Sequence, residues 1–454
     1  MWRKGGGDEH DLIERQFFDR FTREDEVPVM DRVEGSAVEA EAHGSEVRKR
    51  AEMVKGIVQI ASAVFPSDAG STTNQSMSQT SLGQLLMTGV PGPELDAETA
   101  AIFRRIQPGA FILFGRNLQS PPQLRKLIDD LRSLSEIEPI ITIDQEGGRV
   151  SRLKLVGNEP PNANQLRDKG EVELIERHGR ITGRLLRIFG FNLDLCPVLD
   201  ISFDDEADNS LRGRCYGNDV AQVVRNAGAF NRGLRGEGIR SCGKHFPGYS
   251  RAAIDAHHEL PTINLSRGEL EAHELAVFRH FSSAAHCAGN VVDSMMIGHA
   301  FYPSLDASGV PSSLSRPVIT DLLRGELGFR GLVMTDDLDM GAILEPYGKG
   351  ESGLEKVIHT AINAGNDLAM ICHRVEMVAR AHGFLAGVPR AELDRALANV
   401  AAFKALLVPA DPFTEEEFRR RDAEVWDLRV ATLGPDLAAQ RSSEDGKRSP
   451  VETY

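Results

Sequence analysis

The sequence predicts an α/β protein of the (β/α)8 TIM-barrel class, with one barrel domain between an irregular N-terminal arm and a C-terminal tail. Short apolar segments recur through the middle of the chain, and several are continuously apolar, as in parallel strands covered on both faces. Amphipathic helical patterns lie between many of them, which indicates βαβ units. Eight such segments favour a closed barrel.

The predicted strands follow one another in chain order. They cover residues 85–90, 110–115, 140–145, 193–200, 239–246, 292–299, 332–337 and 368–373, with helical patterns between them, for example at 122–133, 220–236 and 317–327. A doubly wound open sheet is the alternative, but it requires a glycine-rich phosphate-binding turn after the first strand. The segment Gly89-Val-Pro-Gly92 does not match G-x-G-x-x-G, and Pro91 suits a loop better than a helix start. The barrel is therefore preferred.

The chain divides into three predicted segments. Residues 1–81 are a charged arm and a polar linker, and the linker at 67–81 has too few apolar side chains to bury a core, so we expect this segment to be largely disordered. Residues 82–408 form the barrel, and a last helical pattern runs through 391–407. Residues 409–454 are a charged tail that we expect to be helical in part. No repeat of 20–50 residues is present, which disfavours a solenoid or a propeller.

Composition disfavours several classes of partner. Among 454 residues, 67 Asp and Glu exceed 52 Lys and Arg, which gives a formal net charge of −15. Such a surface repels phosphate backbones and anionic lipids, so neither nucleic acid nor a membrane is expected as a partner. No apolar run reaches the roughly 20 residues that span a bilayer.

Cysteine usage and the N-terminus bear on the compartment. The five cysteines are scattered and odd in number, which argues against a disulfide framework or a zinc cluster and fits a reducing cytoplasm. The N-terminus as written has no apolar segment typical of a signal peptide. A start at Met53 would give a weak signal-like segment, but Gln59 and Ser62 interrupt it, so a short amphipathic helix is preferred. The expected location is cytoplasmic.

Polar, titratable side chains end six of the eight predicted strands. They are Asp144, Asp200, the pair Lys244 and His245, His299, the pair Asp336 and Asp337, and the pair Cys372 and His373. A single residue of this kind is explained as an ordinary loop start or helix cap. Because the carboxyl ends of barrel strands meet at one rim, where barrel enzymes carry out their chemistry, the whole set predicts a functional site.

Asp336 is the sharpest candidate for chemistry. It directly follows the apolar run Leu332-Val-Met-Thr, which would place its carboxylate at the barrel mouth on a rigid strand. Asp337 and Asp339 raise the alternatives of an acidic metal site or of helix caps. Since no histidine ligands lie nearby, we interpret Asp336 as a carboxylate nucleophile and expect no metal.

Asp255-Ala-His257 is the second candidate. Residues two apart project to the same side of an extended segment, so the carboxylate can orient the imidazole and raise its proton affinity, as a proton shuttle requires. Taken alone, this pattern is more often a surface turn. Its position in a long loop after Lys244 favours the shuttle. The pair His257-His258 is not interpreted as a zinc site, because no third ligand has suitable spacing.

Four further charged residues suit a polyhydroxylated ligand. Carboxylates accept pairs of sugar hydroxyls, whereas Arg and Lys donate to hydroxyl, amide or carboxylate oxygens. The residues are Asp144, Arg152, Arg214 and Lys244. Individually, each is equally well explained as a partner in a surface ion pair.

Six ordered motifs then match a known family. They are Phe111-Ile-Leu-Phe-Gly-Arg-Asn117, Ile143-Asp-Gln-Glu-Gly-Gly-Arg-Val150, Arg214-Cys-Tyr-Gly217, Gly243-Lys-His-Phe-Pro-Gly248, Asp255-Ala-His257 and Gly328-Phe-Arg-Gly-Leu-Val-Met-Thr-Asp-Asp337. Residues 82–408 thereby resemble the β-N-acetylhexosaminidase branch of family-three glycoside hydrolases. The resemblance implies exo-acting, retaining hydrolysis of β-linked N-acetylglucosamine. In bacteria, such enzymes typically recycle peptidoglycan in the cytoplasm, removing this sugar from 1,6-anhydro-N-acetylmuramic acid or its peptides.

The resemblance also implies roles for individual residues. Asp336 corresponds to the nucleophile and His257, assisted by Asp255, to the acid/base, so a His–Asp pair replaces one of the two carboxylates usual in retaining glycosidases. The residues of the sugar subsite are Asp144, Arg152, Arg214, Lys244 and His245. A small carbohydrate is the expected partner, no cofactor is implied, and a monomer is expected.

The chain departs from the family pattern at three places. Tyr249-Ser250 stands where the loop usually reads His-Gly, Ala256 replaces the serine of the dyad motif, and Cys215 replaces a serine before Tyr216. Two alternatives stay open. One is a retaining β-glucosidase or xylosidase of the same family, although too few residues follow 408 for the second domain of those enzymes. The other is a catalytically silent barrel that binds muropeptides.

Overall fold

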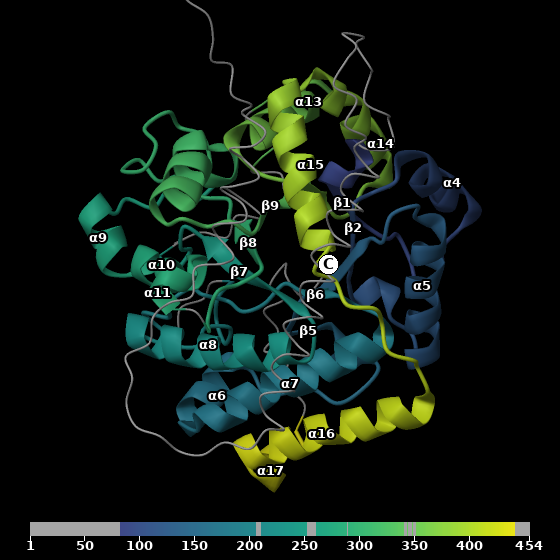
Figure 1. Ribbon diagram of the computed structural model, residues 1–454. Helices are drawn as coiled ribbons and strands as arrows, with labels where there is room; N and C mark the ends of the chain where they lie inside the picture. Colours follow the sequence, from purple (N-terminus) through teal and green to yellow (C-terminus); the bar gives the residue numbers. More distant parts are fainter. Residues whose placement is uncertain are drawn as a thin grey trace, which may run out of the picture. The chain divides into compact units, whose positions relative to one another are not determined.

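Eight parallel strands form a closed barrel in the computed structural model, so the predicted (β/α)8 fold is confirmed. The structure describes residues 82–205, 210–251, 260–287, 289–339, 343, 347 and 351–440. Within these residues the order around the barrel is β1-β10-β9-β8-β7-β6-β3-β2, and β1 pairs with both β2 and β10 to close it. Figure 1 shows the strands at the centre with helices around them. The strands are β1 (Leu86–Gly89), β2 (Ala110–Leu113), β3 (Ile140–Ile143), β6 (Leu193–Asp194), β7 (Arg240–Phe246), β8 (Ser294–Ile297), β9 (Leu332–Asp337) and β10 (Leu368–Ile371).

Each predicted strand therefore exists, but two of the segments differ from a plain strand. The third continues past Ile143 into a small antiparallel hairpin of β4 (Gln145–Gly147) and β5 (Val150–Ser151). The fourth keeps regular pairing only at Leu193–Asp194, and one further bridge joins Val198 to Lys244. Both irregular segments lie at the carboxyl end of the barrel, where loops build binding sites.

Helices cover the outside of the barrel. They are α4 (Ala97–Ile106), α5 (Pro121–Leu134), α6 (Ala163–Lys169), α7 (Val172–Phe189), α8 (Val220–Gly236), α9 (Arg267–Ala272), α10 (Glu274–Ser282), α11 (Ala284–Cys287), η5 (Pro317–Glu326), α13 (Glu351–Ala364), α14 (Val375–Phe384), α15 (Arg390–Lys404), α16 (Glu415–Leu433) and α17 (Pro435–Ala438). Short helical turns lie at Gly83–Leu85, Gly115–Asn117, Arg152–Leu155, Ser312–Leu314 and Leu385–Gly387. None of the helices within the described ranges has both the length and the apolar character that crossing a bilayer requires.

Local sequence signals explain where the helices begin. The Ser120 side chain accepts a hydrogen bond from the Gln123 amide, and the Gln123 side chain accepts one from the Ser120 amide. Pro121 stands in the first turn of α5. Asp219 caps α8 by accepting the amide of Gln222. The predicted helices at 122–133 and 220–236 agree with α5 and α8.

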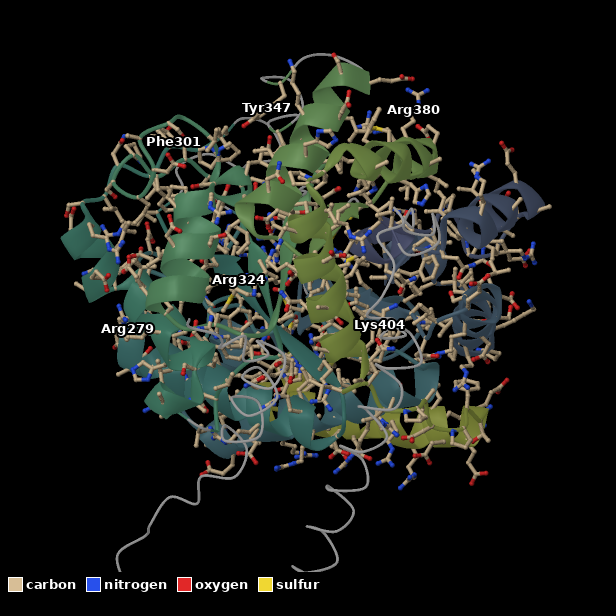
Figure 2. All side chains as sticks on the ribbon, turned by 45° about the horizontal axis from the view of Figure 1, so that its top comes forward. Arg279, Phe301, Arg324, Tyr347, Arg380 and Lys404 are labelled. Carbon is tan, nitrogen blue, oxygen red and sulfur yellow. The ribbon has the colours of Figure 1, made fainter. Side chains whose placement is uncertain are left out.

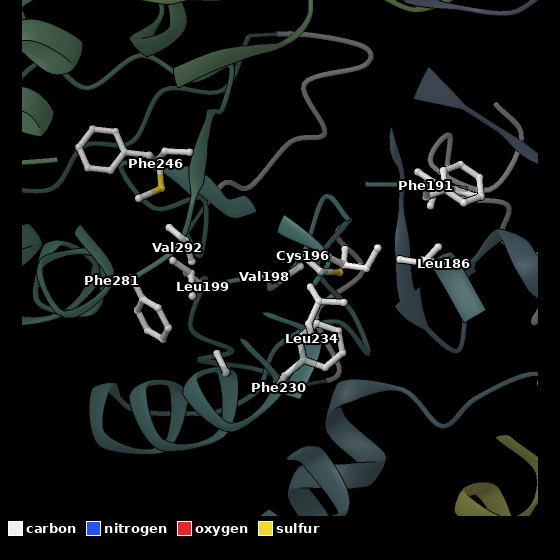
Figure 3. Close-up of a cluster of buried hydrophobic side chains, with 14 of the residues drawn as sticks. Leu186, Phe191, Cys196, Val198, Leu199, Phe230, Leu234, Phe246, Phe281 and Val292 are labelled. Atoms are coloured by element: carbon white, nitrogen blue, oxygen red, sulfur yellow. The ribbon is translucent and has the colours of Figure 1, made fainter. Parts of the chain in front are cut away.

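The core between the sheet and the helices is apolar and tightly packed. Figure 3 shows part of it, where Phe230 and Leu234 of α8 lie below side chains of the barrel, including Val198 and Leu199. The helices α7 and α8 cross closely because two glycines allow it. A Cβ atom on Gly179 would lie 2.2 Å from the Phe230 carbonyl oxygen, and one on Gly233 would lie 2.2 Å from the Glu176 carbonyl oxygen.

A buried carboxylate and a partly buried lysine hold the amino-terminal end of the barrel. Asp367, before β10, accepts Arg324 of η5 and Arg395 of α15 at 2.6 Å each. Lys404, at the end of α15, donates to the Gln84 side chain at 2.7 Å. Arg324 and Lys404 are labelled in Figure 2. These contacts lie at the end of the barrel opposite to the catalytic rim of this fold, which is the end associated with stability.

The described part of the segment after residue 408 forms helices that pack on the barrel domain. The helix α16 lies along α7 (Figure 1). Its side chains Phe418, Val425 and Leu428 belong to the same hydrophobic cluster as Phe189 of α7, and the rings of Phe189 and Phe418 are 5.6 Å apart. The predicted arm, residues 1–81, and residues 441–454 lie outside the described ranges.

Four described cysteines are free and buried. They are Cys196, Cys215, Cys242 and Cys372. Burial raises the pKa of the Cys242 thiol to about 12, and it raises the pKa values of the other three well above the ordinary thiol value.

Candidate active site

The strand register brings the predicted polar residues to one rim. Ile143 of β3 pairs with Asp194 of β6, and Ile297 of β8 pairs with Thr335 of β9. Asp144 and Asp336 each follow one of these paired positions, so they emerge at the same end of the barrel. Lys244 and His245 lie near the carboxyl end of β7, next to this end of the barrel.

A buried lysine joins two carboxylates beneath this rim. Lys244 Nζ lies 2.7 Å from Asp144 Oδ1 and 2.6 Å from Glu146 Oε1, and only 2% of its side chain is exposed. Burial alone would lower the pKa of Lys244, but Asp144 and Glu146 outweigh it and raise the pKa. Burial alone would raise the pKa of Glu146, but Arg214 and Lys244 lower it below its usual range. Lys244 and Glu146 thus keep their charges in the folded protein.

Arg214 completes this cluster from a separate loop. Its guanidinium donates two hydrogen bonds of 2.7 Å to Glu146, one to each carboxylate oxygen, and a third of 3.0 Å to the Ser210 carbonyl. Only 5% of the Arg214 side chain is exposed. A two-point contact of this kind fixes the orientation of both groups.

Asp144 is the member of the cluster that solvent reaches most. Its side chain is 14% exposed, compared with 7% for Arg152, whose Nη2 lies 3.7 Å from Asp144 Oδ2. Lys244 and Arg152 therefore hold the Asp144 carboxylate from two sides. A carboxylate held in this way accepts ligand hydroxyl groups without having to reorganise.

His245 is oriented by Asp200. The ring Nδ1 lies 2.8 Å from Asp200 Oδ2, the His245 amide donates to the same oxygen at 3.1 Å, and the Tyr249 amide donates to Asp200 Oδ1 at 2.6 Å. Because an ionised carboxylate only accepts hydrogen bonds, the proton of the neutral ring is on Nδ1. The other nitrogen, Nε2, is then an acceptor for a ligand hydroxyl.

Asp336 lies near the end of β9 and is half-buried, and its Oδ1 accepts the Asp337 amide at 2.8 Å. Asp337 in turn is fixed from two neighbouring strands. Its Oδ1 accepts the Cys372 amide at 3.1 Å, and its carbonyl oxygen lies 3.0 Å from His299 Nε2. Since a carbonyl only accepts, His299 Nε2 carries the proton, and the ring Nδ1 accepts from the Ser313 hydroxyl at 2.7 Å.

Cys372 follows β10 and its thiol is buried. Burial is the main cause of its raised pKa, and the charges of Asp337, Asp339, Asp336 and Asp144 raise it further. Asp339 itself accepts the amide of His373 at 2.9 Å and the Arg374 side chain at 2.9 Å. Among the described residues, no three His, Cys, Asp or Glu side chains are grouped so as to hold a metal ion.

Asp255 and His257 lie outside the described residues, so their pairing stays a prediction. Two of the residues at which the chain departs from the family pattern, Tyr249 and Ser250, lie just before the part of that loop outside the described residues. Tyr249 is buried with its ring centre 6.1 Å from that of His245, and the Ser250 hydroxyl accepts the Ile201 amide at 2.8 Å. The third departure, Cys215, is buried beside Arg214.

Glu146 was not predicted as a site residue, whereas Asp200 and His299 were predicted only as members of the set of polar residues that end the strands. A signal for Glu146 was present, because it stands two residues after Asp144 in an extended segment and so projects to the same side. Asp200 and His299 each end a predicted strand, but their partners come from distant segments that a single sequence does not pair.

Comparison with known proteins decides the family. The model of the glycosyl hydrolase family 3 N-terminal domain matches residues 77–402. The chain belongs to this family. A relative named beta-hexosaminidase, from Vibrio cholerae serotype O1 (strain M66-2), is 36% identical over 292 residues, which are 64% of this chain and 83% of the relative. Membership makes this chain a glycosidase.

Solved structures of family 3 enzymes share the fold. A glycoside hydrolase family 3 beta-N-acetylglucosaminidase from Paenibacillus sp. str. FPU-7 is 31% identical with a TM-score of 0.70, covering 79% of this chain and 69% of that one. NagZ from Neisseria gonorrhoeae is 28% identical with a TM-score of 0.64, covering 76% of this chain and 97% of that one.

Proposed function

We propose that this chain is a retaining exo-β-N-acetylglucosaminidase that removes terminal β-linked N-acetylglucosamine. The observation that carries the proposal is the position of Asp336, a half-buried carboxylate that emerges at the same end of the barrel as Asp144. Relatives whose names specify beta-hexosaminidase or beta-N-acetylglucosaminidase activity support the choice of sugar.

The reaction is a double displacement. The Asp336 carboxylate attacks the anomeric carbon and forms a glycosyl–enzyme ester, while the bond to the leaving oxygen breaks and that oxygen takes a proton from His257. His257 then removes a proton from water, the resulting hydroxide attacks the anomeric carbon, and the Asp336 carboxylate is released. In this mechanism Asp255 orients the His257 ring and stabilises its protonated form.

The sugar subsite is assigned to Asp144, Arg152, Arg214, Lys244 and His245. Asp144 and His245 Nε2 accept ligand hydroxyls, and Arg152 donates to the sugar. The donors of Lys244 and Arg214 are engaged by Asp144 and Glu146, so the role of these two residues is to hold the carboxylates in place.

The same proposal extends to the identity of the natural substrate. We infer that the natural substrates are peptidoglycan fragments in which N-acetylglucosamine is linked to 1,6-anhydro-N-acetylmuramic acid or its peptides. Their processing belongs to cell-wall recycling by a cytoplasmic, monomeric enzyme. A carbohydrate substrate is consistent with the subsite chemistry, and no cofactor enters the proposed steps.

The deciding experiment compares aryl β-N-acetylglucosaminide with aryl β-glucoside and aryl β-xyloside. Rapid hydrolysis of the first alone is expected from the wild-type chain, and Asp336→Asn should lose it because no ester can form. Preference for the glucoside or xyloside would establish the second activity of the family instead. Sugar binding without turnover of any of the three would identify a silent binding barrel. Near-normal activity of Asp336→Asn would contradict the mechanism.

A further inference from the structure

The helix α16 lies beyond the residues that the family model matches, yet it contacts a loop that leads to the sugar subsite. The loop, residues 156–162, joins the short helical turn after β5 to α6. Figure 1 shows α16 beneath α7. One side of α16 packs into the core, and other side chains on it reach this loop.

Asp422 of α16 binds one loop residue at both its main chain and its side chain. The Asn158 amide donates to Asp422 Oδ1 at 2.6 Å, and Asn158 Nδ2 donates to Asp422 Oδ2 at 2.7 Å and to the Asp422 carbonyl at 3.1 Å. Gly157 leaves room for this contact, because a Cβ there would lie 2.4 Å from Asp422 Oδ1. The loop is thus fitted to the helix at this point.

Arg429, two turns further along α16, makes a second contact. It is 4% exposed, donates to the Glu159 carbonyl at 3.1 Å, and has its Nη1 3.8 Å from Glu159 Oε1. The rest of the guanidinium donates to the carbonyls of Ala438 and Gln440. Two neighbouring loop residues are therefore held by two side chains of one helix.

The held loop in turn supports the β4–β5 hairpin. The Gly148 amide donates to the Pro160 carbonyl at 3.0 Å. A Cβ on Gly147, which has φ +114°, would lie 2.4 Å from the Pro161 carbonyl oxygen. The hairpin backbone therefore rests directly on the loop, and glycine is required at this contact.

We propose that Asp422 is a positioning residue for the sugar subsite, acting through Asn158 and the loop 156–162 on the hairpin that carries Glu146 and leads into Arg152. The proposal rests on the proposed function for the ligand that the subsite takes. Loss of the Asn158 contact lets the hairpin move relative to Lys244 and Arg214, and the subsite loses its fixed geometry. Small displacements of positioning groups have large kinetic effects.

The test uses Asp422→Asn in the full chain, because the asparagine keeps an acceptor for the Asn158 amide but places a donor opposite Asn158 Nδ2. The matched control is Glu424→Gln on the same helix, which removes the 2.9 Å pair with Arg184 of α7 and leaves the loop untouched. Amide hydrogen exchange of residues 146–153 is measured for both, together with KM and kcat on aryl β-N-acetylglucosaminide.

Asp422→Asn is expected to speed exchange in the hairpin and to raise KM about tenfold with kcat nearly unchanged, whereas Glu424→Gln changes neither. In an Asn158→Ala background, Asp422→Asn should have no further effect. Unchanged hairpin exchange in Asp422→Asn, or equal effects of the two variants, would overturn the positioning role. A wild-type chain that does not hydrolyse the substrate would overturn the proposed function alone, since hydrogen exchange still decides this inference.

Discussion

Glu146 and Arg214 meet in a buried ion pair in which each carboxylate oxygen accepts one guanidinium N–H at 2.7 Å. Glu146 also binds Lys244 at 2.6 Å, so one carboxylate connects the hairpin, β7 and the loop before α8. A residue with these contacts determines how three separate segments of the subsite are arranged.

We therefore expect Glu146→Gln to lower kcat/KM on aryl β-N-acetylglucosaminide about 10–100-fold, as loss of an orienting partner does in other sites. Breaking a buried ion pair should also lower the free energy of unfolding by about 3–5 kcal/mol, measured in urea. Glu138→Gln is the control, since its pair with Arg132 is half exposed and contributes under about 1 kcal/mol. Similar results for both variants would show that the cluster is not required.

The pair of His245 and Asp200 gives a second prediction. In Asp200→Asn an amide nitrogen can face the imidazole, which favours the tautomer with the proton on Nε2 and removes the acceptor from the sugar side. KM should rise about tenfold or more. In NMR spectra, the chemical shifts of Nδ1 and Nε2 of His245 should show that the protonated nitrogen has changed from Nδ1 to Nε2. Asp205→Asn, in the same loop but paired with Arg167, should leave both unchanged. An unaltered tautomer in Asp200→Asn would refute the assignment.

His178 of α7 provides a prediction about pH. It is fully buried beside Phe230, and burial lowers its pKa from 6.5 to about 4. As the pH falls, the unfolded chain therefore binds a proton at His178 before the folded protein does. The contribution of the neutral ring to the free energy of unfolding is complete above pH 6.5 and is lost as the pH falls towards 4. Between pH 7.5 and 5 the loss from this one residue is about 2 kcal/mol.

His178→Leu removes this titration and keeps an apolar side chain in the site. The difference in unfolding free energy between pH 7.5 and 5, measured in urea, should be about 2 kcal/mol smaller in the variant than in the wild type. Equal pH dependence of the two proteins would show that the ring is accessible to protons in the folded state.

The close crossing of α7 and α8 gives a matched pair of glycine variants. Gly233→Ala forces a methyl group against the Glu176 carbonyl, so the free energy of unfolding should fall by about 1–3 kcal/mol or more. Gly236→Ala in the same helix meets no atom within 4 Å and should be neutral or stabilising by up to about 1 kcal/mol. Thermal unfolding checks both, and the opposite order would mean that the helices are not packed as described.

Much of the architecture was predictable because it is encoded locally. Apolar runs located all eight strands, and capping residues such as Ser120 and Asp219 explain the helix starts. The β4–β5 hairpin was missed because two- and three-residue strands carry no periodicity. The polar residues that end the strands identified the rim, since the carboxyl ends of parallel strands meet there.

Longer-range relationships were not accessible from one sequence. Asp200 gives no local sign that it binds His245, and Asp422 gives none that it binds Asn158, because 45 and 264 residues separate these partners. Lys244 and Arg214 were predicted as sugar contacts from their residue type, but only the structure shows that their donors are engaged by buried carboxylates. The sequence motifs and the charges thus identify Lys244 and Arg214 as members of the site, but their burial beside the carboxylates determines what they contact.

The buried thiols offer a way to observe the barrel opening. Cys196 follows β6, Cys242 lies in β7, Cys372 follows β10 and Cys215 precedes α8, and all four are buried with raised thiol pKa values. Because alkylating reagents react with the thiolate, each cysteine becomes reactive only when its own sector opens. The protein thus carries natural reporters around its circumference, and the order in which iodoacetamide modifies them gives the order in which the sectors separate.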